Sequence, residues 1–425
     1  MRFIALVYLL TFYGLADAAP AGMTPKLSTW SEFVERITWV SSWKEAKNNP
    51  DVILDTLEMI RKAGYPAEAH VVTTEDGYRL TLHRIPGAND SLPVLLQHGL
   101  LCSSVDWIFL GRGKALAYLL ADQGYDVWLG NFRGNTYSRA HISLSPSNLT
   151  FWDFSFNEMG IYDLPAMFTY ITNITSQSLH TYIGHSMGAA SFYIMALERP
   201  EFARMVQKMI SFAPAVFISH MKSPIKYFSK TFPLELYKLI MRHFFHNEFL
   251  PQNNFWKYLA KYGCKQNIIE EKICANLIFI ICGYDREQLN YTLLPIILSH
   301  DPAGASTKTI LHYVQIYQTG KFRKYDYGLD KNLLVYNSSE PPDYNLANIT
   351  FPIALFYGLG DWLVDTLDVK RLYHILPNVI DMYEVQWPEF NHVDFMLAKD
   401  APRLVYERVF KLMKGETSNN ITSMG

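Results

Sequence analysis

The residues Gly184-His185-Ser186-Met187-Gly188 have the spacing of a nucleophile turn. They follow a short β-like run at 181–183 and precede a helix-forming stretch that begins with Ala189. A chain that leaves a strand, turns sharply and enters a helix needs small residues beside the turn, and Gly184 and Gly188 meet that need. The short motif alone arises often by chance. Its position between a strand and a helix favours Ser186 as a nucleophile.

A serine hydroxyl becomes a good nucleophile when a histidine takes its proton and a carboxylate orients that histidine. At a turn of this kind the chain order is serine, acid, histidine. The candidates late in the chain are His374 and His392. His374 lies in an expected surface helix, whereas His392 lies in a loop directly after an expected last strand. We therefore predict His392 as the general base, and the alternative for it is an ordinary solvated loop residue.

The acid should follow the strand before that last one. Residues 353–357 have the composition of a buried strand, and a glycine-containing turn leads from them to Asp361. Asp365 and Asp368 follow closely, but helix capping or ion pairing is the commoner role of such aspartates. We predict Asp361 as the acid, with Asp365 as the main alternative.

An oxyanion that forms during ester cleavage needs two backbone N–H donors. The residue after the nucleophile, Met187, should supply one of them. The other should come from the loop after an earlier strand, and Leu100 in 95–101 has that position. His98 in the same loop is expected to form structural hydrogen bonds and not to act as a second base.

The elements that would position these groups alternate between short apolar runs and helical stretches from about residue 71. A turn signal at 75–77 predicts a hairpin between two strand-like pieces. Further strands are expected at 93–97, 125–129, 181–183, 208–212, 353–357 and 382–387, and helices at 112–123 and 162–175. This pattern predicts an α/β-hydrolase fold, a mostly parallel central sheet with helices on both faces.

Residues 214–345 interrupt this alternation and are rich in aromatic residues. Apolar positions recur with helical spacing in 234–245, which fits either one core-facing helix or part of an inserted cap. The segment lies between the nucleophile and the acid, so we expect a helical cap or lid over the carboxyl edge of the sheet, where ligands bind. The core then comprises 53–213 and 346–414.

The N-terminus predicts export. Arg2, the apolar stretch 3–12 and the small residues around 16–18 form a signal-peptide pattern over 1–18, too short to span a membrane. Residues 19–52 would form an N-terminal extension or propeptide, and 415–425 a flexible tail. We expect secretion, with lysosomal delivery as the alternative. Glycosylation sequons begin at Asn89, Asn148, Asn173, Asn290, Asn337, Asn348 and Asn420.

The composition excludes several classes of partner. Lys and Arg number 38 and Asp and Glu 40, so the formal charge of -2 offers no field for nucleic acid. There is no His-Glu-x-x-His motif, and the four cysteines lack metal-site spacing, so we expect no metal and no cofactor. Three cysteines lie close together in the chain, which suggests one local disulfide and one leftover thiol. We expect no transmembrane anchor and a monomer.

A longer set of motifs resembles the acid lipase family, which includes gastric, lysosomal and insect lipases. The matching segments are collinear over about 55–412 and lie at 64–68, 73–78, 97–100, 133–139, 151–156, 162–166, 184–188, 302–304, 321–322, 360–363 and 392–395. The resemblance implies hydrolysis of neutral-lipid esters at a lipid–water interface by Ser186, Asp361 and His392, under a cap with a mobile lid.

The same resemblance implies a Cys264–Cys274 disulfide and a free Cys282, and it names no partner for Cys102. Met187 departs from the glutamine that is frequent in the better-known mammalian members, but only its backbone N–H is needed. Residues 19–49 have no counterpart in the family pattern. Two alternatives remain, a serine esterase or acyltransferase acting on small soluble esters and a catalytically silent lipid-binding protein. The aromatic insertion argues against the first and the filled triad against the second.

Overall fold

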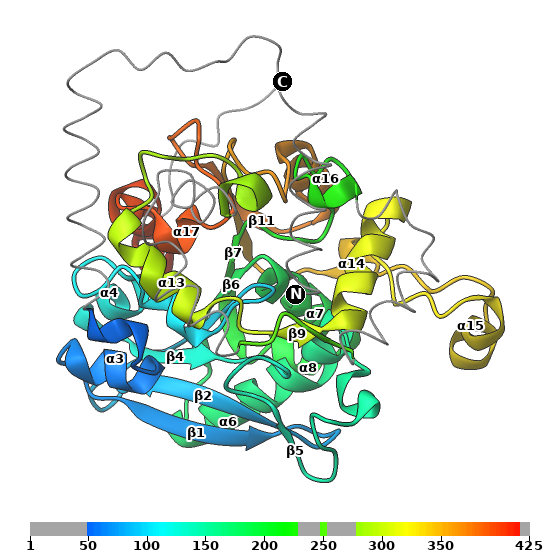
Figure 1. Ribbon diagram of the computed structural model, residues 1–425, viewed down its shortest axis with the longest axis horizontal. Coiled ribbons are helices and arrows are strands. Elements are labelled where there is room, and N and C mark those ends of the chain that lie inside the picture. The colour runs from blue at the N-terminus through cyan, green and yellow to red at the C-terminus, as the bar shows by residue number, and fades with distance from the viewer. Residues whose placement is uncertain (1–48, 228–246, 253–277, 417–425) are drawn as a thin grey trace, which may run out of the picture. The chain divides into compact units, whose positions relative to one another are not determined.

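A computed structural model describes residues 49–227, 247–252 and 278–416 of the chain. Its main feature is a nine-stranded mixed sheet in the order β1-β2-β4-β3-β6-β7-β10-β11, with β5 paired to β2 (Figure 1). The strands are β1 (Glu68–Thr73), β2 (Tyr78–Ile85), β3 (Pro93–Gln97), β4 (Asp126–Gly130), β5 (Ala140–His141), β6 (Leu179–His185), β7 (Val206–Phe212), β10 (Ile353–Tyr357) and β11 (Val379–Glu384). From β4 to β11 all neighbours are parallel, whereas β1, β2 and β4 pair antiparallel.

The predicted strands agree closely with these bounds, apart from the last one. The hairpin of β1 and β2 forms around the expected turn, and β3 and β10 occupy the predicted residues. The expected strand at 382–387 is misplaced along the chain by three residues, because β11 begins at Val379 and ends at Glu384. This strand lies at the sheet edge and most of its residues are half-exposed, and Asp381 interrupts its apolar residues, so its start is hard to recognise in the sequence. After the strand, the N–H of Trp387 donates a hydrogen bond to the carbonyl of Val385, so the chain turns there.

The helices cover both faces of the sheet. They are α3 (Thr56–Lys62), α4 (Leu116–Asp122), α5 (Phe156–Glu158), α6 (Leu164–Thr175), α7 (Met187–Glu198), α8 (Pro200–Ala203), α13 (Leu294–His300), α14 (Thr307–Thr319), α15 (Leu329–Tyr336), α16 (Thr366–Ile375), α17 (Asp394–Leu397) and α18 (Glu407–Met413). The helix predicted at 112–123 begins four residues later, because Gly111 and Gly113 have φ values of 74° and 78°. A π-helical turn at Met159–Asp163 precedes α6.

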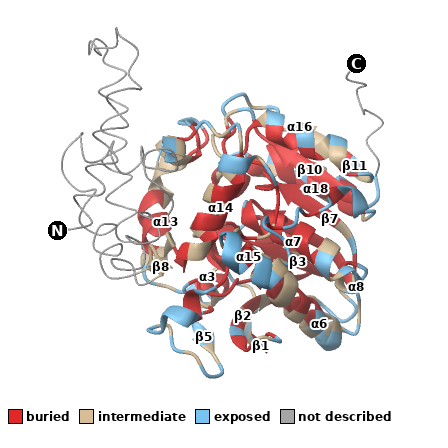
Figure 2. Ribbon diagram, turned by 90° about the vertical axis from the view of Figure 1, so that its right-hand side faces the viewer, coloured by how far each residue is buried: buried red, intermediate tan, exposed pale blue. Residues whose placement is uncertain are grey.

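Two apolar cores result from the alternation of side chains along each strand. Leu95 and Tyr182 pack into one core with residues of α6, α7 and α16. Their chain neighbours Leu96 and Ile183 pack into the other core with residues of α4, α17 and α18. Figure 2 shows the central strands and the helices against them as largely buried. The expected α/β-hydrolase architecture, with helices on both faces, is confirmed.

Between β7 and β10 the described chain contains α13, α14, α15 and the short antiparallel pair β8 (Glu248–Phe249) and β9 (Ala305–Ser306). This part is tied to the loop before α5, since the Ser306 hydroxyl donates to the Trp152 carbonyl at 2.6 Å. The helix expected at 234–245 lies outside the described residues, as do the signal peptide, most of the N-terminal extension, Asn420, Cys264 and Cys274. Within the described residues, no helix has the length and apolar character needed to span a membrane.

Candidate active site

Ser186 occupies the sharp turn between β6 and α7. Strand β6 ends at His185 and helix α7 begins at Met187, so this single residue makes the reversal, with φ 54° and ψ -112°. A non-glycine residue in this conformation costs free energy and persists only where its surroundings hold it. Here the Ser186 N–H donates to the Phe212 carbonyl at 2.9 Å, and the Ser186 carbonyl accepts from Ala190 at 3.1 Å. The turn therefore has the expected nucleophile geometry.

Close backbone contacts explain the two glycines of this turn. A Cβ on Gly188 would lie 2.6 Å from the carbonyl oxygen of Gln97, and one on Gly184 would lie 2.8 Å from the backbone nitrogen of Ala189. Neither neighbour is the flexible end of a side chain. The need for small residues at both positions, inferred from the sequence, therefore has a direct steric cause.

The three predicted side chains form one hydrogen-bonded series. The Ser186 hydroxyl lies 2.9 Å from Nε2 of His392, and Nδ1 of His392 lies 2.8 Å from Oδ2 of Asp361. All three residues are buried, with 7%, 4% and 1% of their surfaces exposed. If Nδ1 carries the imidazole proton and donates to the carboxylate, Nε2 is an acceptor for the serine proton. This arrangement can move a proton from serine to histidine and stabilise the charge that results.

The alternative acids have other partners, and the alternative histidine is exposed. Asp365 caps α16 by accepting from the N–H of Leu367 at 2.9 Å, and it pairs with Lys222 at 2.8 Å. Asp368 accepts from the backbone and ring of His220. His374 is exposed on α16. Of these three acids, Asp361 is the one that lies against the ring of His392, and its role in orienting that histidine stays a prediction.

The second oxygen of Asp361 is also held. Its Oδ1 accepts two backbone hydrogen bonds, from Leu363 and from Val364, each at 2.8 Å. These donors fix the rotation of the carboxylate, so that Oδ2 stays directed at the imidazole. They also satisfy much of the hydrogen-bonding capacity that a buried carboxylate needs.

The loop that carries His392 is held by two groups whose roles the sequence did not reveal. His185 places its Nε2 at 2.8 Å from the His392 carbonyl. Burial lowers the pKa of His185 well below its usual value, so the ring is neutral and its one proton is used in this bond. The Cys282 carbonyl accepts from the N–H of His392 at 3.3 Å and from that of Trp362 at 3.1 Å. Because this contact is made by a backbone oxygen, no side-chain motif in the sequence indicates it.

The residue after Cys282 permits that close approach. Gly283 has a φ of 115°, and a Cβ there would lie 2.0 Å from the Gly360 carbonyl oxygen. Its own carbonyl accepts from the side-chain amide of Asn391 at 3.0 Å. Residues 282–283 thus contact both the turn that carries Asp361 and the loop that carries His392.

The predicted oxyanion donors lie on the two segments that meet at the serine. Met187 is the first residue of α7, where backbone N–H groups have no acceptor within the helix. Leu100 follows Gly99, whose Cβ, if present, would lie 3.2 Å from the Cβ of Ser186. The loop after β3 therefore reaches the nucleophile directly.

His98 forms structural hydrogen bonds, as expected from the sequence. Its Nδ1 lies 2.7 Å from the Gly99 carbonyl, and its Nε2 accepts from the N–H of Phe132 at 3.0 Å. Burial lowers the pKa of His98 to about 4, so the ring is neutral near pH 7. Both nitrogens are used in holding the loop, and neither is directed to Ser186.

Comparisons with known proteins agree with this fold. The family model for the alpha/beta hydrolase fold matches residues 93–240, and that for a partial alpha/beta-hydrolase lipase region matches 56–111. Together with the sheet and the turn at Ser186, these matches place the chain among the α/β-hydrolases.

The relatives narrow this class to one family. Lipase 3 of Drosophila melanogaster is 43% identical over 85% of this chain and 93% of its own length. Gastric triacylglycerol lipase of Homo sapiens is 40% identical over 86% of this chain and 92% of its own length. Lysosomal acid lipase/cholesteryl ester hydrolase of Macaca fascicularis is 37% identical over 97% and 99%. The chain belongs to the acid lipase family of carboxylic ester hydrolases, which confirms the resemblance seen in its motifs.

Proposed function

We propose that the chain is a serine lipase that hydrolyses the carboxylic ester bonds of neutral lipids through an acyl-enzyme intermediate. The observation that carries the proposal is the hydrogen-bonded series from Ser186 through His392 to Asp361. A hydroxyl, an imidazole and a carboxylate in this order provide a nucleophile, a general base and an orienting acid.

In the proposed reaction His392 takes the Ser186 proton as the serine oxygen attacks the ester carbonyl. The backbone N–H groups of Leu100 and Met187 donate to the oxyanion. When the tetrahedral intermediate collapses, the carbon–oxygen bond to the alcohol breaks and the alcohol leaves with the proton from His392. Water then attacks the acyl-enzyme, with His392 again as base, and releases the fatty acid and free serine. The Asp361 carboxylate stabilises the imidazolium through its hydrogen bond to Nδ1.

The substrate class rests on the relatives, whose names specify triacylglycerol and cholesteryl esters. We propose acylglycerols, sterol esters or both, presented at a lipid–water interface and covered in the closed state by residues 214–345.

Secretion or lysosomal delivery fits the N-terminal pattern. Of the sequon asparagines in the described part, all are exposed except Asn290, which is half-buried, and exposure is what glycosylation at these sites requires.

Covalent labelling tests the nucleophile. A fluorophosphonate probe should label the wild-type chain stoichiometrically and should not label Ser186→Ala. Ser191→Ala is a matched control, because Ser191 is also a buried serine in α7 and should leave labelling intact. Labelling of Ser186→Ala at the wild-type rate would remove the proposal.

A hydrolysis panel tests the substrate class. Emulsified triacylglycerol, a cholesteryl ester and a short soluble ester should be compared at acidic and neutral pH, with free fatty acid as the readout. We expect turnover of an emulsified lipid to exceed that of the soluble ester. Preference for the soluble ester, or transfer of the acyl group to an alcohol instead of water, would favour a serine esterase or acyltransferase.

A further inference from the structure

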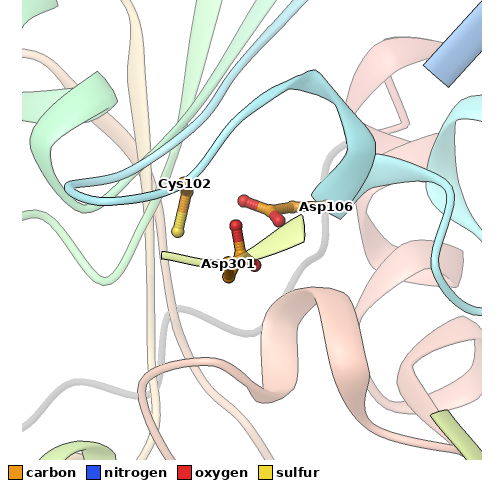
Figure 3. Close-up of side chains that lie close together, drawn as sticks. All are labelled: Cys102, Asp106 and Asp301. Carbon is orange, nitrogen blue, oxygen red and sulfur yellow. The ribbon is translucent and has the colours of Figure 1, made fainter. Parts of the chain in front are cut away.

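A second group of chemically reactive side chains lies near the oxyanion loop. Cys102, Asp106 and Asp301 converge from two segments far apart in the sequence, and one ligand atom from each lies within 4.8 Å of the others (Figure 3). Cys102 lies in the loop after β3 and Asp106 in the short 3-10 helix Ser104–Trp107 that follows it, whereas Asp301 directly follows α13. Both described cysteines, Cys102 and Cys282, are free thiols. The spacing along the chain gave no sign of this cluster.

Each of the two carboxyl groups has one buried oxygen without a donor. Asp106 is only 4% exposed, and its Oδ2 accepts from the N–H of Ser103 at 3.2 Å. Its Oδ1 and the Oδ1 of Asp301 are both buried, and within the described residues neither has a hydrogen-bond partner. Carboxylate oxygens can only accept, so two that face each other need a shared proton or a cation between them. A buried carboxylate that has neither would be costly.

We infer that Cys102, Asp106 and Asp301 bind a divalent cation of the zinc class. A thiolate with two carboxylates is a ligand set that Zn²⁺ accepts, whereas Ca²⁺ and Mg²⁺ take oxygen ligands. Zinc bound by these three side chains would take a water as its fourth ligand. Three protein ligands and one water form an open tetrahedral zinc site.

The three ligand atoms would have to move slightly closer together to bind zinc. Zinc bonds of about 2.0 to 2.3 Å place tetrahedral ligand atoms roughly 3.3 to 3.8 Å apart. The present atoms lie within 4.8 Å of one another, so side-chain rotations of about an ångström suffice. The site is thus pre-assembled without the ion, and binding would not require a backbone rearrangement.

Metal analysis tests the site directly. The full-length chain is freed of metal with a chelator, equilibrated with zinc at neutral pH, passed through a desalting column and measured for zinc by mass spectrometry. We expect about one equivalent in the wild type and a loss of at least tenfold in affinity in Cys102→Ala, Asp106→Asn and Asp301→Asn. Cys282→Ala removes a free buried thiol outside the cluster and should keep its zinc.

Cobalt substitution supplies a second readout. Co²⁺ bound to the wild type should show a thiolate charge-transfer band that Cys102→Ala lacks. Asp106→Asn keeps the shape of the side chain, and its circular dichroism checks that it folds. If the wild type binds no zinc, or if the three variants bind as much as the wild type, the inference is overturned and the two acids instead share a proton. Loss of zinc only in Cys282→Ala would place the ion elsewhere and would also overturn it.

Discussion

Replacing Asp361 with asparagine should invert the tautomer of His392 without disturbing the fold. Oδ1 of Asp361 accepts from the N–H groups of Leu363 and Val364. In Asp361→Asn the amide oxygen should take this place, because the amide nitrogen cannot accept a hydrogen bond. The NH₂ group then faces Nδ1 of His392, where it can only donate. The imidazole must move its proton to Nε2, and it then offers Ser186 a donor instead of an acceptor.

The expected loss follows from that geometry. A histidine held in the wrong tautomer cannot take the serine proton, and the corresponding change in a serine protease lowers kcat by about 10⁴-fold. This factor equals roughly 5.5 kcal/mol in the activation free energy. Stability should change little, since the asparagine keeps the volume of the side chain and both backbone hydrogen bonds.

The assay is the rate of fluorophosphonate labelling together with the turnover of a soluble chromogenic ester. Asp365→Asn is the matched control, because Asp365 lies four residues away, caps α16 and pairs with Lys222. An asparagine there retains a capping oxygen, so the control should lose little stability and keep near-normal turnover. The reasoning fails if Asp361→Asn keeps more than a tenth of the wild-type rate, or if Asp365→Asn shows the large loss instead.

Three further predictions follow from single contacts. Gly283→Ala should lower kcat at least tenfold, because the new Cβ would lie 2.0 Å from the carbonyl oxygen of Gly360, in the turn that carries Asp361. Gly113→Ala is the control, because Gly113 also has a positive φ but a Cβ there would have no atom within 4 Å, so its kcat should stay near the wild-type value. His185→Phe removes the bond to the His392 carbonyl and should cost about 1 to 3 kcal/mol in urea unfolding; an unchanged midpoint would contradict this. In metal-free protein, Asp106→Asn should be more stable than the wild type in urea unfolding at pH 7, but not below about pH 4. The reason is that stability from a carboxyl with a raised pKa is present at low pH and is lost as the pH rises through about 6.

The core of the fold and the candidate triad could be predicted because their signals are local. Strands β3 and β10 are buried along their whole length, so their apolar runs mark them directly. The turn at Ser186 is constrained by steric contacts that only small neighbours allow, and the fixed chain order of the fold then limits the acid and the base to a few residues. Edge strand β11 has no such marker, and its bounds were correspondingly misplaced.

The contacts that hold the site together could not be predicted, because they join distant segments through backbone atoms or through unremarkable side chains. Nothing in the sequence marks the carbonyl of Cys282 as an acceptor for His392 and Trp362. Nor does the spacing of Cys102 and Asp301 suggest proximity. Such contacts depend on how the segment after residue 277 folds back over the core, which local patterns do not determine.

That segment contacts the site at two separate places. Residues 282–283 hold the loops of the acid and the base, and further along the N–H of Ala303 donates at 2.6 Å to the carbonyl of Leu101, beside the proposed oxyanion donor Leu100. One stretch of chain therefore touches all the loops that would carry the reaction, although it supplies none of the reacting groups. A change in its conformation would alter the positions of base, acid and oxyanion donor together. For this reason an ion bound by Asp301 and the loop after β3 should affect turnover, even though it would not touch the substrate.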